Sequence, residues 1–147
     1  MGFFSSLDIS ASGLTAQRVR MDTISQNIAN VNTTRTEDGT PYRRRDVLFE
    51  ERKGSDSFSS ILSNASSNLS DGRGVRVTKI YEDSSDFKKV FDPGHPDADA
   101  DGYVSMPNVD VVTEMVNMIS STRSYEANVT SMNATKSMAL KALEIGK

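Results

Sequence analysis

The segment LDISASGLTAQRVRMDTISQNIANV, residues Leu7–Val31, carries the clearest structural signal in the chain. Four apolar side chains recur there at a spacing of seven residues: Leu7, Leu14, Met21 and Ile28. Phe3 and Ile24 lie three or four positions from this row, so one face of a helix would carry an apolar seam. A seam sustained over about four repeats is typical of a coiled coil.

We expect this helix to end at a motif formed by Asn30, Asn32 and Thr33. Asparagine tolerates the left-handed backbone conformation, and threonine disfavours continuation of a helix. The sequence therefore predicts an N-terminal helical segment over residues 1–34.

The C-terminal part repeats the pattern. Two rows recur at the same spacing of seven: Val111, Met118, Tyr125 and Met132 in one, and Met115, Thr122, Val129 and Leu143 in the other, which is interrupted at Lys136. Asn108 is a candidate N-cap, and Asp110 and Glu114 would lie in the first two turns, where the helix dipole favours acids. We therefore expect a second coiled-coil helix over residues 108–147.

The middle, residues 35–107, differs in kind and is expected to be β-rich or irregular. YRRRDVLFEE (residues 42–51) and GVRVTKIY (residues 74–81) have the alternation of short strands, and KKVF (residues 88–91) is a possible third. A serine-rich loop is expected at 54–74, and an acidic connector at 92–107. The predicted fold class is mainly α with a small β region, the two long terminal helices being paired as a coiled coil.

The stretch DADADG, residues 97–102, resembles the start of an EF-hand calcium loop. Counted from Asp97, position twelve is Asn108, which cannot supply the bidentate carboxylate that such a loop needs. Pro93 and Pro96 also forbid the preceding helix. We expect a turn-rich connector and no metal, and keep a calcium-binding module as an alternative.

The composition of the 147 residues excludes several classes of function. Cysteine is absent, histidine occurs once, and the net charge is only −3. Thiol chemistry is excluded, and no nucleophile or phosphate-loop motif is present. We expect no enzyme, no cofactor, no nucleic-acid partner and no membrane insertion, and the opening MGFFSSLDISASG does not have the pattern of a cleavable secretory signal.

The two helices offer a narrow apolar seam, and small residues such as Gly13 and Ala16 would let further helices approach closely. A hairpin of this kind is stable when neighbours cover its other faces, which favours an assembling subunit over a self-contained two-helix domain with a β insert. A small coiled-coil adaptor is kept as an alternative. The expected assembly interface is Phe3, Leu7, Leu14, Met21, Ile24, Ile28, Val111, Met115, Met118, Tyr125, Val129, Met132 and Leu143.

The segment SGLTAQRVRMDTISQNIANVNTTRT (residues 12–36) resembles the N-terminal signature of the bacterial flagellar axial proteins, which are the rod, hook and hook-associated subunits. Residues 92–129 resemble the C-terminal signature of a proximal-rod subunit, and DGTPYRRR (residues 38–45) also fits that member. The resemblance runs nearly from end to end, except for residues 55–71.

This resemblance implies a structural subunit of the flagellar basal-body rod, in the proximal part that crosses the periplasm. It implies export by the flagellar type III apparatus without signal cleavage, with FFSSL (residues 3–7) or FSSIL (residues 58–62) as the export signal. The subunit would then polymerise helically with other rod subunits and with copies of itself, and transmit torque. Asn30, Asn32 and Thr33 would match the helix-end motif of the family.

Overall fold

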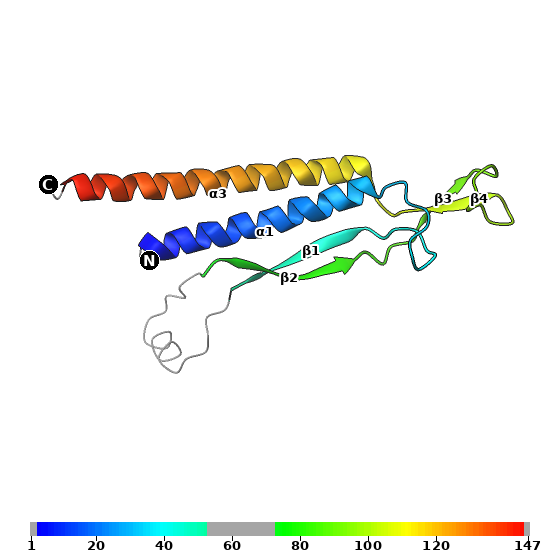
Figure 1. Ribbon diagram of the computed structural model, residues 1–147, viewed down its shortest axis with the longest axis horizontal. Coiled ribbons are helices and arrows are strands. Elements are labelled where there is room, and N and C mark those ends of the chain that lie inside the picture. Colours follow the sequence, from blue (N-terminus) through cyan, green and yellow to red (C-terminus); the bar gives the residue numbers. More distant parts are fainter. Residues whose placement is uncertain (1–2, 53–72, 146–147) are drawn as a thin grey trace, which may run out of the picture.

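A computed structural model describes residues 3–52 and 73–145 of the chain (Figure 1). The candidate export signal at 58–62 lies outside the described residues, as does nearly all of the serine-rich loop expected at 54–74. Two long helices, α1 (Phe3–Ala29) and α3 (Val111–Ile145), enclose four strands in sequence order. The predicted fold class, mainly helical with a small β region between long terminal helices, is confirmed.

The two helices pack side by side and run in opposite directions (Figure 1). α1 lies between α3 on one side and the hairpin of β1 (Arg45–Glu51) and β2 (Val75–Glu82) on the other. A second hairpin, β3 (Lys88–Phe91) and β4 (Tyr103–Met106), projects past the end where α1 stops and α3 starts. At the opposite end, α3 extends past the start of α1.

α1 ends at Ala29 without the left-handed residue that the sequence suggested. In the described residues only glycines have positive φ, and Asn30 acts through its side chain instead. The Asn30 amide donates to the Gln26 carbonyl at 2.9 Å, and its oxygen accepts from the Thr33 hydroxyl at 3.1 Å. Two residues of the expected helix-end motif, Asn30 and Thr33, therefore bond to each other, and Asn30 satisfies one carbonyl of the last helical turn.

α3 is capped by Asp110 and not by Asn108. The Asp110 carboxylate accepts from the Val112 amide and from the Thr113 hydroxyl, both at 3.0 Å. These hydrogen bonds, led by that of Thr113, lower the pKa of Asp110 below its ordinary value. Asn108 is thereby free for a contact with the β region that is described below.

Both sheets are two-stranded and antiparallel. The register of β1 and β2 shifts between Leu48 and Phe49, where a bulge interrupts the ladder. The three strands expected from the sequence are present. β4 was not predicted: it lies within the segment expected to be an acidic connector, which instead forms the turn and second strand of a hairpin.

The apolar core is small. In the described residues, the buried hydrophobic side chains are Ala16, Ile24, Tyr42, Val47, Val104 and Val109. Buried polar groups are as numerous and include the fully buried Asn27 and Glu114. Neither helix has a stretch apolar enough to cross a bilayer, as judged over the described residues.

Candidate functional site: a polar junction and the exposed faces of the helix pair

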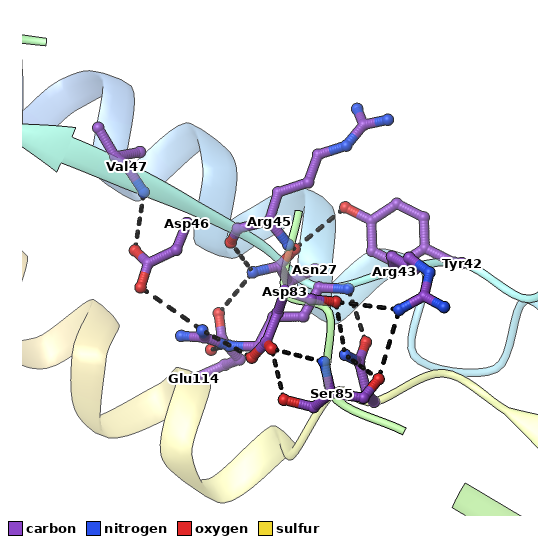
Figure 2. A network of polar contacts seen from close by, with 11 residues as sticks. Asn27, Tyr42, Arg43, Arg45, Asp46, Val47, Asp83, Ser85 and Glu114 are labelled. Atoms are coloured by element: carbon purple, nitrogen blue, oxygen red, sulfur yellow. Dashed lines mark hydrogen bonds and ion pairs between the residues drawn. The ribbon is translucent and has the colours of Figure 1, made fainter. Parts of the chain in front are cut away.

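The last turns of α1 are joined to β1 through the side chain of Asn27, which is 0% exposed. Its Nδ2 donates to the Arg45 carbonyl at 2.8 Å, and its Oδ1 accepts from the Arg45 amide at 2.9 Å and from the Tyr42 hydroxyl at 3.0 Å (Figure 2). The amide thus pairs with the main chain of Arg45 as a neighbouring strand would. All polar atoms of this buried side chain are satisfied.

Glu114, in the first turn of α3, closes the junction and is also 0% exposed. One carboxylate oxygen accepts from Asn27 Nδ2 at 2.9 Å, and the other accepts from Arg44 Nε at 2.8 Å. A buried carboxylate is tolerated only when it is paired and hydrogen-bonded, and both conditions hold here. We call Asn27, Tyr42, Arg44 and Glu114 the polar junction.

Arg44 carries the positive charge of the polar junction. It lies 3.5 Å from Asp46 and 3.8 Å from Asp83, in addition to its contact with Glu114. Burial alone would lower the pKa of Arg44, but the hydrogen bond and charge of Glu114, followed by the charges of the two aspartates, raise it overall. The guanidinium therefore stays charged and holds three acidic side chains together.

A second set of hydrogen bonds fastens the segment after β2 to the same place. Asn108 Oδ1 accepts from the Arg44 amide at 2.8 Å, and its Nδ2 donates to the carbonyls of Asp83 and Ser85 at 3.2 and 3.4 Å. Arg43 donates to the same two carbonyls (Figure 2). Four segments that are distant in sequence therefore meet at one end of the helix pair.

The contact between the helices is built from small and polar side chains. The α3 residues nearest α1 form a row at spacing seven that the sequence did not single out: Glu114, Ser121, Asn128 and Thr135. Gly13 of α1 lies so close to Asn128 that an added Cβ would be 3.0 Å from its amide. The hydroxyls of Ser121 and Thr135 donate to carbonyls of their own helix, so both side chains can be buried without a hydrogen-bond partner on α1.

The residues predicted to form the assembly interface occupy different places. Ile24 is buried, and the half-buried members are Leu7, Leu14, Met21, Ile28, Met118, Tyr125, Val129 and Met132. Val111, Met115 and Leu143 are exposed. The side chain of Phe3 lies outside the described residues. The predicted rows thus flank the helix contact, and part of them faces outward.

Large apolar side chains are exposed on α3 at both of its ends. Near its start they are Val112, Met115, Val116 and Ile119, beside a shallow hollow that is also lined by Ser120, Arg123 and Ser124. Near its end they are Met138, Leu140, Leu143 and Ile145. Two such groups on one helix of a chain with so small a core indicate surfaces that other proteins cover.

The acidic turn of the second hairpin serves as a contact between parts of the chain. Asp97 accepts from the Thr34 hydroxyl at 2.8 Å and lies 3.8 Å from Arg35, while Asp99 accepts from the Ala100 amide. Within residues 3–52 and 73–145, no three His, Cys, Asp or Glu side chains are grouped as a metal site requires. The calcium alternative has no support from this geometry.

Comparison with known proteins gives matches over both ends and over the whole length. Residues 7–35 match the family described as "Flagella basal body rod protein", and residues 100–145 match "Flagellar basal body rod FlgEFG protein C-terminal". The chain is 57% identical to the flagellar basal-body rod protein FlgC of Bacillus subtilis, and the alignment covers 100% of both chains. It is 48% identical to FlgC of Borreliella burgdorferi, over 99% of this chain and 98% of that protein, and 43% identical to FlgC of Escherichia coli O157:H7, over 100% of each. The chain therefore belongs to the FlgC family of flagellar basal-body rod proteins.

Proposed function

We propose that this protein, a structural subunit of the flagellar basal-body rod and not an enzyme, is held in the rod by the faces of its terminal helices. Its family implies assembly with other rod components. The finer proposal is that the subunit polymerises helically, both with those components and with copies of itself. The contacts would be made by the outward-facing members of the predicted interface, among them Val111, Met115 and Leu143.

The observation that carries this proposal is the exposure of large apolar side chains on α3. Val112 is 69% exposed and Leu143 is 72% exposed, although each occurs in a formed helix with apolar neighbours on the same surface. Burying one such side chain contributes roughly 1.5–3 kcal/mol, so covering several of them is a strong driving force for association. The small core leaves few other places where these residues could be buried.

The polar junction supports a mechanical role. A rod that transmits torque needs a stiff connection between the helices and the β region. The ion pairs of Arg44 with Glu114, Asp46 and Asp83, and the four hydrogen bonds of Asn27, fix that connection at a single point. We also propose export by the flagellar type III apparatus, for which FFSSL at the start of α1 remains a candidate signal.

The test is incorporation into basal bodies. Met115→Lys and Leu143→Lys each place a charge on an exposed apolar position, so the circular dichroism of the purified chain should stay unchanged. We expect both variants to be lost from detergent-extracted basal bodies and to abolish swimming. Ser131→Lys, at an exposed polar position of α3, is the matched control and should be incorporated normally. Normal recovery of both lysine variants from basal bodies would contradict the proposed interface.

A further inference from the structure

Gly13 is the only glycine within α1, and α3 contains none. A glycine in the interior of a helix makes that helix less stable than alanine would, so its presence there needs a reason in the packing. The structure gives that reason, because a Cβ at position 13 would lie 3.0 Å from both Oδ1 and Nδ2 of Asn128. Gly13 thus makes room for the side chain of Asn128.

The side chain of Asn128 is held in the orientation that fills this space. Its Nδ2 donates to the carbonyl of Ser124, one turn earlier on α3, at 2.9 Å. In the row of α3 residues nearest α1, the neighbours of Asn128 are Ser121 and Thr135, whose side chains end one atom closer to the backbone. Asn128 therefore projects furthest of these three, and it does so opposite the one position of α1 that has no side chain.

The apolar rows beside this contact do not select one axial alignment of the two helices. One row on each helix recurs every seven residues: Leu7, Leu14, Met21 and Ile28 on α1, and Val111, Met118, Tyr125 and Met132 on α3. After a shift by seven residues, the members of these rows would again lie beside one another. The same shift would place Asn128 opposite Ser6 or Arg20, and both residues have the Cβ that Gly13 lacks.

A second contact between the helices has the same alignment. Asn27 of α1 donates to Glu114 of α3 at 2.9 Å. Fourteen residues separate Gly13 from Asn27, and fourteen separate Glu114 from Asn128, so the two contacts lie about four turns apart on both helices. We propose that Gly13 and Asn128 form a register lock, which acts together with the polar junction to restrict α1 and α3 to one axial alignment.

The alignment decides where the outer faces of α3 lie relative to the β region. A slip by seven residues would move α3 by about 10 Å along α1, and α1 also packs against the β1–β2 hairpin. A subunit with this error would have intact helices but a displaced outer surface. Gly13 and Asn128 are thus positioning residues. Their role goes beyond the proposed function, because it holds within one chain whichever proteins cover the exposed faces.

Cross-linking within one chain measures the alignment, because the natural chain has no cysteine. The Thr122 hydroxyl lies 3.7 Å from the Met21 sulfur, so the pair Met21→Cys/Thr122→Cys reports the alignment of the structure. Met115 and Val129 are seven residues to either side of Thr122, so Met21→Cys combined with Met115→Cys or Val129→Cys reports a slip. Each purified variant is treated with a bis-maleimide too short to span a shift of about 10 Å, and the cross-linked monomer is quantified on a denaturing gel.

The register lock is tested in a background that lacks the polar junction. With Glu114→Ala alone, we expect the first cysteine pair to cross-link and the two slip pairs to stay unlinked. With Glu114→Ala/Asn128→Ala, both contacts are lost, and the slip pairs together should match the first pair in yield. Asn133→Ala is the matched control, since Asn133 is an exposed asparagine of the same helix and should leave the alignment unchanged. Glu114→Gln provides a milder background if Glu114→Ala unfolds the chain.

A second measurement isolates the contact itself. Gly13→Ala should lower the urea midpoint of the natural chain, because the added Cβ meets Asn128. In an Asn128→Ala chain the same change should raise the midpoint, because the helix gains an alanine and the amide is gone. A lower midpoint in both backgrounds would contradict the contact.

The cross-linking result separates an effect on alignment from an effect on stability. If Glu114→Ala/Asn128→Ala loses the first cross-link and gains no slip product, Asn128 only stabilises the helix pair and the proposal is overturned. Slip products in the natural background, or as many with Asn133→Ala as with Asn128→Ala, would overturn it as well. So would the absence of every cross-link in the natural background, because the free chain would then have no fixed alignment.

Discussion

Replacing Glu114 by alanine should weaken the polar junction by an amount that can be worked out from its contacts. The change removes the acceptors of Arg44 Nε at 2.8 Å and of Asn27 Nδ2 at 2.9 Å. Removing one partner of a buried pair typically destabilises by about 3–5 kcal/mol. Arg44 keeps Asp46 and Asp83 at 3.5 and 3.8 Å, so we expect the lower end, about 3 kcal/mol.

The assay is urea unfolding of the purified chain, followed by circular dichroism at neutral pH. With an m-value of about 2 kcal/mol per molar urea, the midpoint should fall by about 1.5 M. Glu114→Gln keeps the size of the side chain, but the NH2 group of glutamine then faces one of the two donors, Arg44 Nε or Asn27 Nδ2. We expect this variant to lower the free energy of unfolding by about half as much as Glu114→Ala, roughly 1.5 kcal/mol.

Glu126→Ala is the matched control, since Glu126 is an exposed acid on the same helix and should change the stability by no more than about 0.5 kcal/mol. The expected loss of stability is largest for Glu114→Ala, smaller for Glu114→Gln and smallest for the control, and this order follows from the burial and pairing of Glu114. If Glu114→Ala unfolds within about 0.5 kcal/mol of the natural chain, the junction does not stabilise the fold and the reasoning is refuted.

Three further results are expected from other contacts. Gly74 has φ of +89°, and an added Cβ would be 2.2 Å from the Ser12 hydroxyl oxygen, so Gly74→Ala should lower the free energy of unfolding by about 2–3 kcal/mol. The control is Gly39→Ala, at φ +75° with open space around it, which should lower the free energy of unfolding by only about 1 kcal/mol. Equal urea midpoints of the two variants would contradict the contact of Gly74 with α1. Burial raises the pKa of Tyr42 above 10.0; Arg45 opposes this effect, and Glu82 and Glu114 add to it. The contribution of Tyr42 to stability is therefore present below pH 10 and is lost as the pH rises through the raised pKa. Tyr42→Phe should therefore lose about 1 kcal/mol at pH 7 and show a smaller further loss in unfolding measurements above pH 10. Because the pKa of Asp110 is lowered in the fold, its contribution to stability is present above pH 3.8 and is lost as the pH falls through the lowered pKa. Asp110→Ala should therefore reduce helicity at pH 7 and differ less from the natural chain in acid, whereas Asp110→Asn should retain the cap. Unchanged helicity of the alanine variant at pH 7 would argue against this cap.

The two long helices could be predicted from sequence because their periodicity is local. The spacing of Leu7, Leu14, Met21 and Ile28 is visible in a single window, and so is the strand alternation in residues 74–81. β4 was missed because the aspartate- and proline-rich segment before it dominates its neighbourhood, although Tyr103 pairs with Phe91 across the hairpin.

The polar junction could not be predicted, because no local pattern relates its members. Asn27 and Glu114 are 87 residues apart, and each alone is an ordinary polar residue of a helix. The sequence placed Glu114 among the acids that favour a helix start, which is correct for its position but gives no sign of its burial. The residues at the contact between the helices differ from those expected for a similar reason. The sequence favoured apolar rows, whereas Ser121 and Thr135 are buried because they are small and their hydroxyls donate to carbonyls of their own helix.

The way Asn27 contacts Arg45 has a consequence for how the sequence of this region can change. The amide binds only main-chain atoms of Arg45, which every amino acid except proline can offer in the same form. The side chain at position 45, whose contacts are an exposed ion pair with Glu82 and the face of the Tyr42 ring, can therefore change without loss of the bonds to Asn27. At position 27, no other amino acid has the same shape together with the same donors and acceptor. A saturation library screened for motility should accordingly be permissive at 45 and strict at 27.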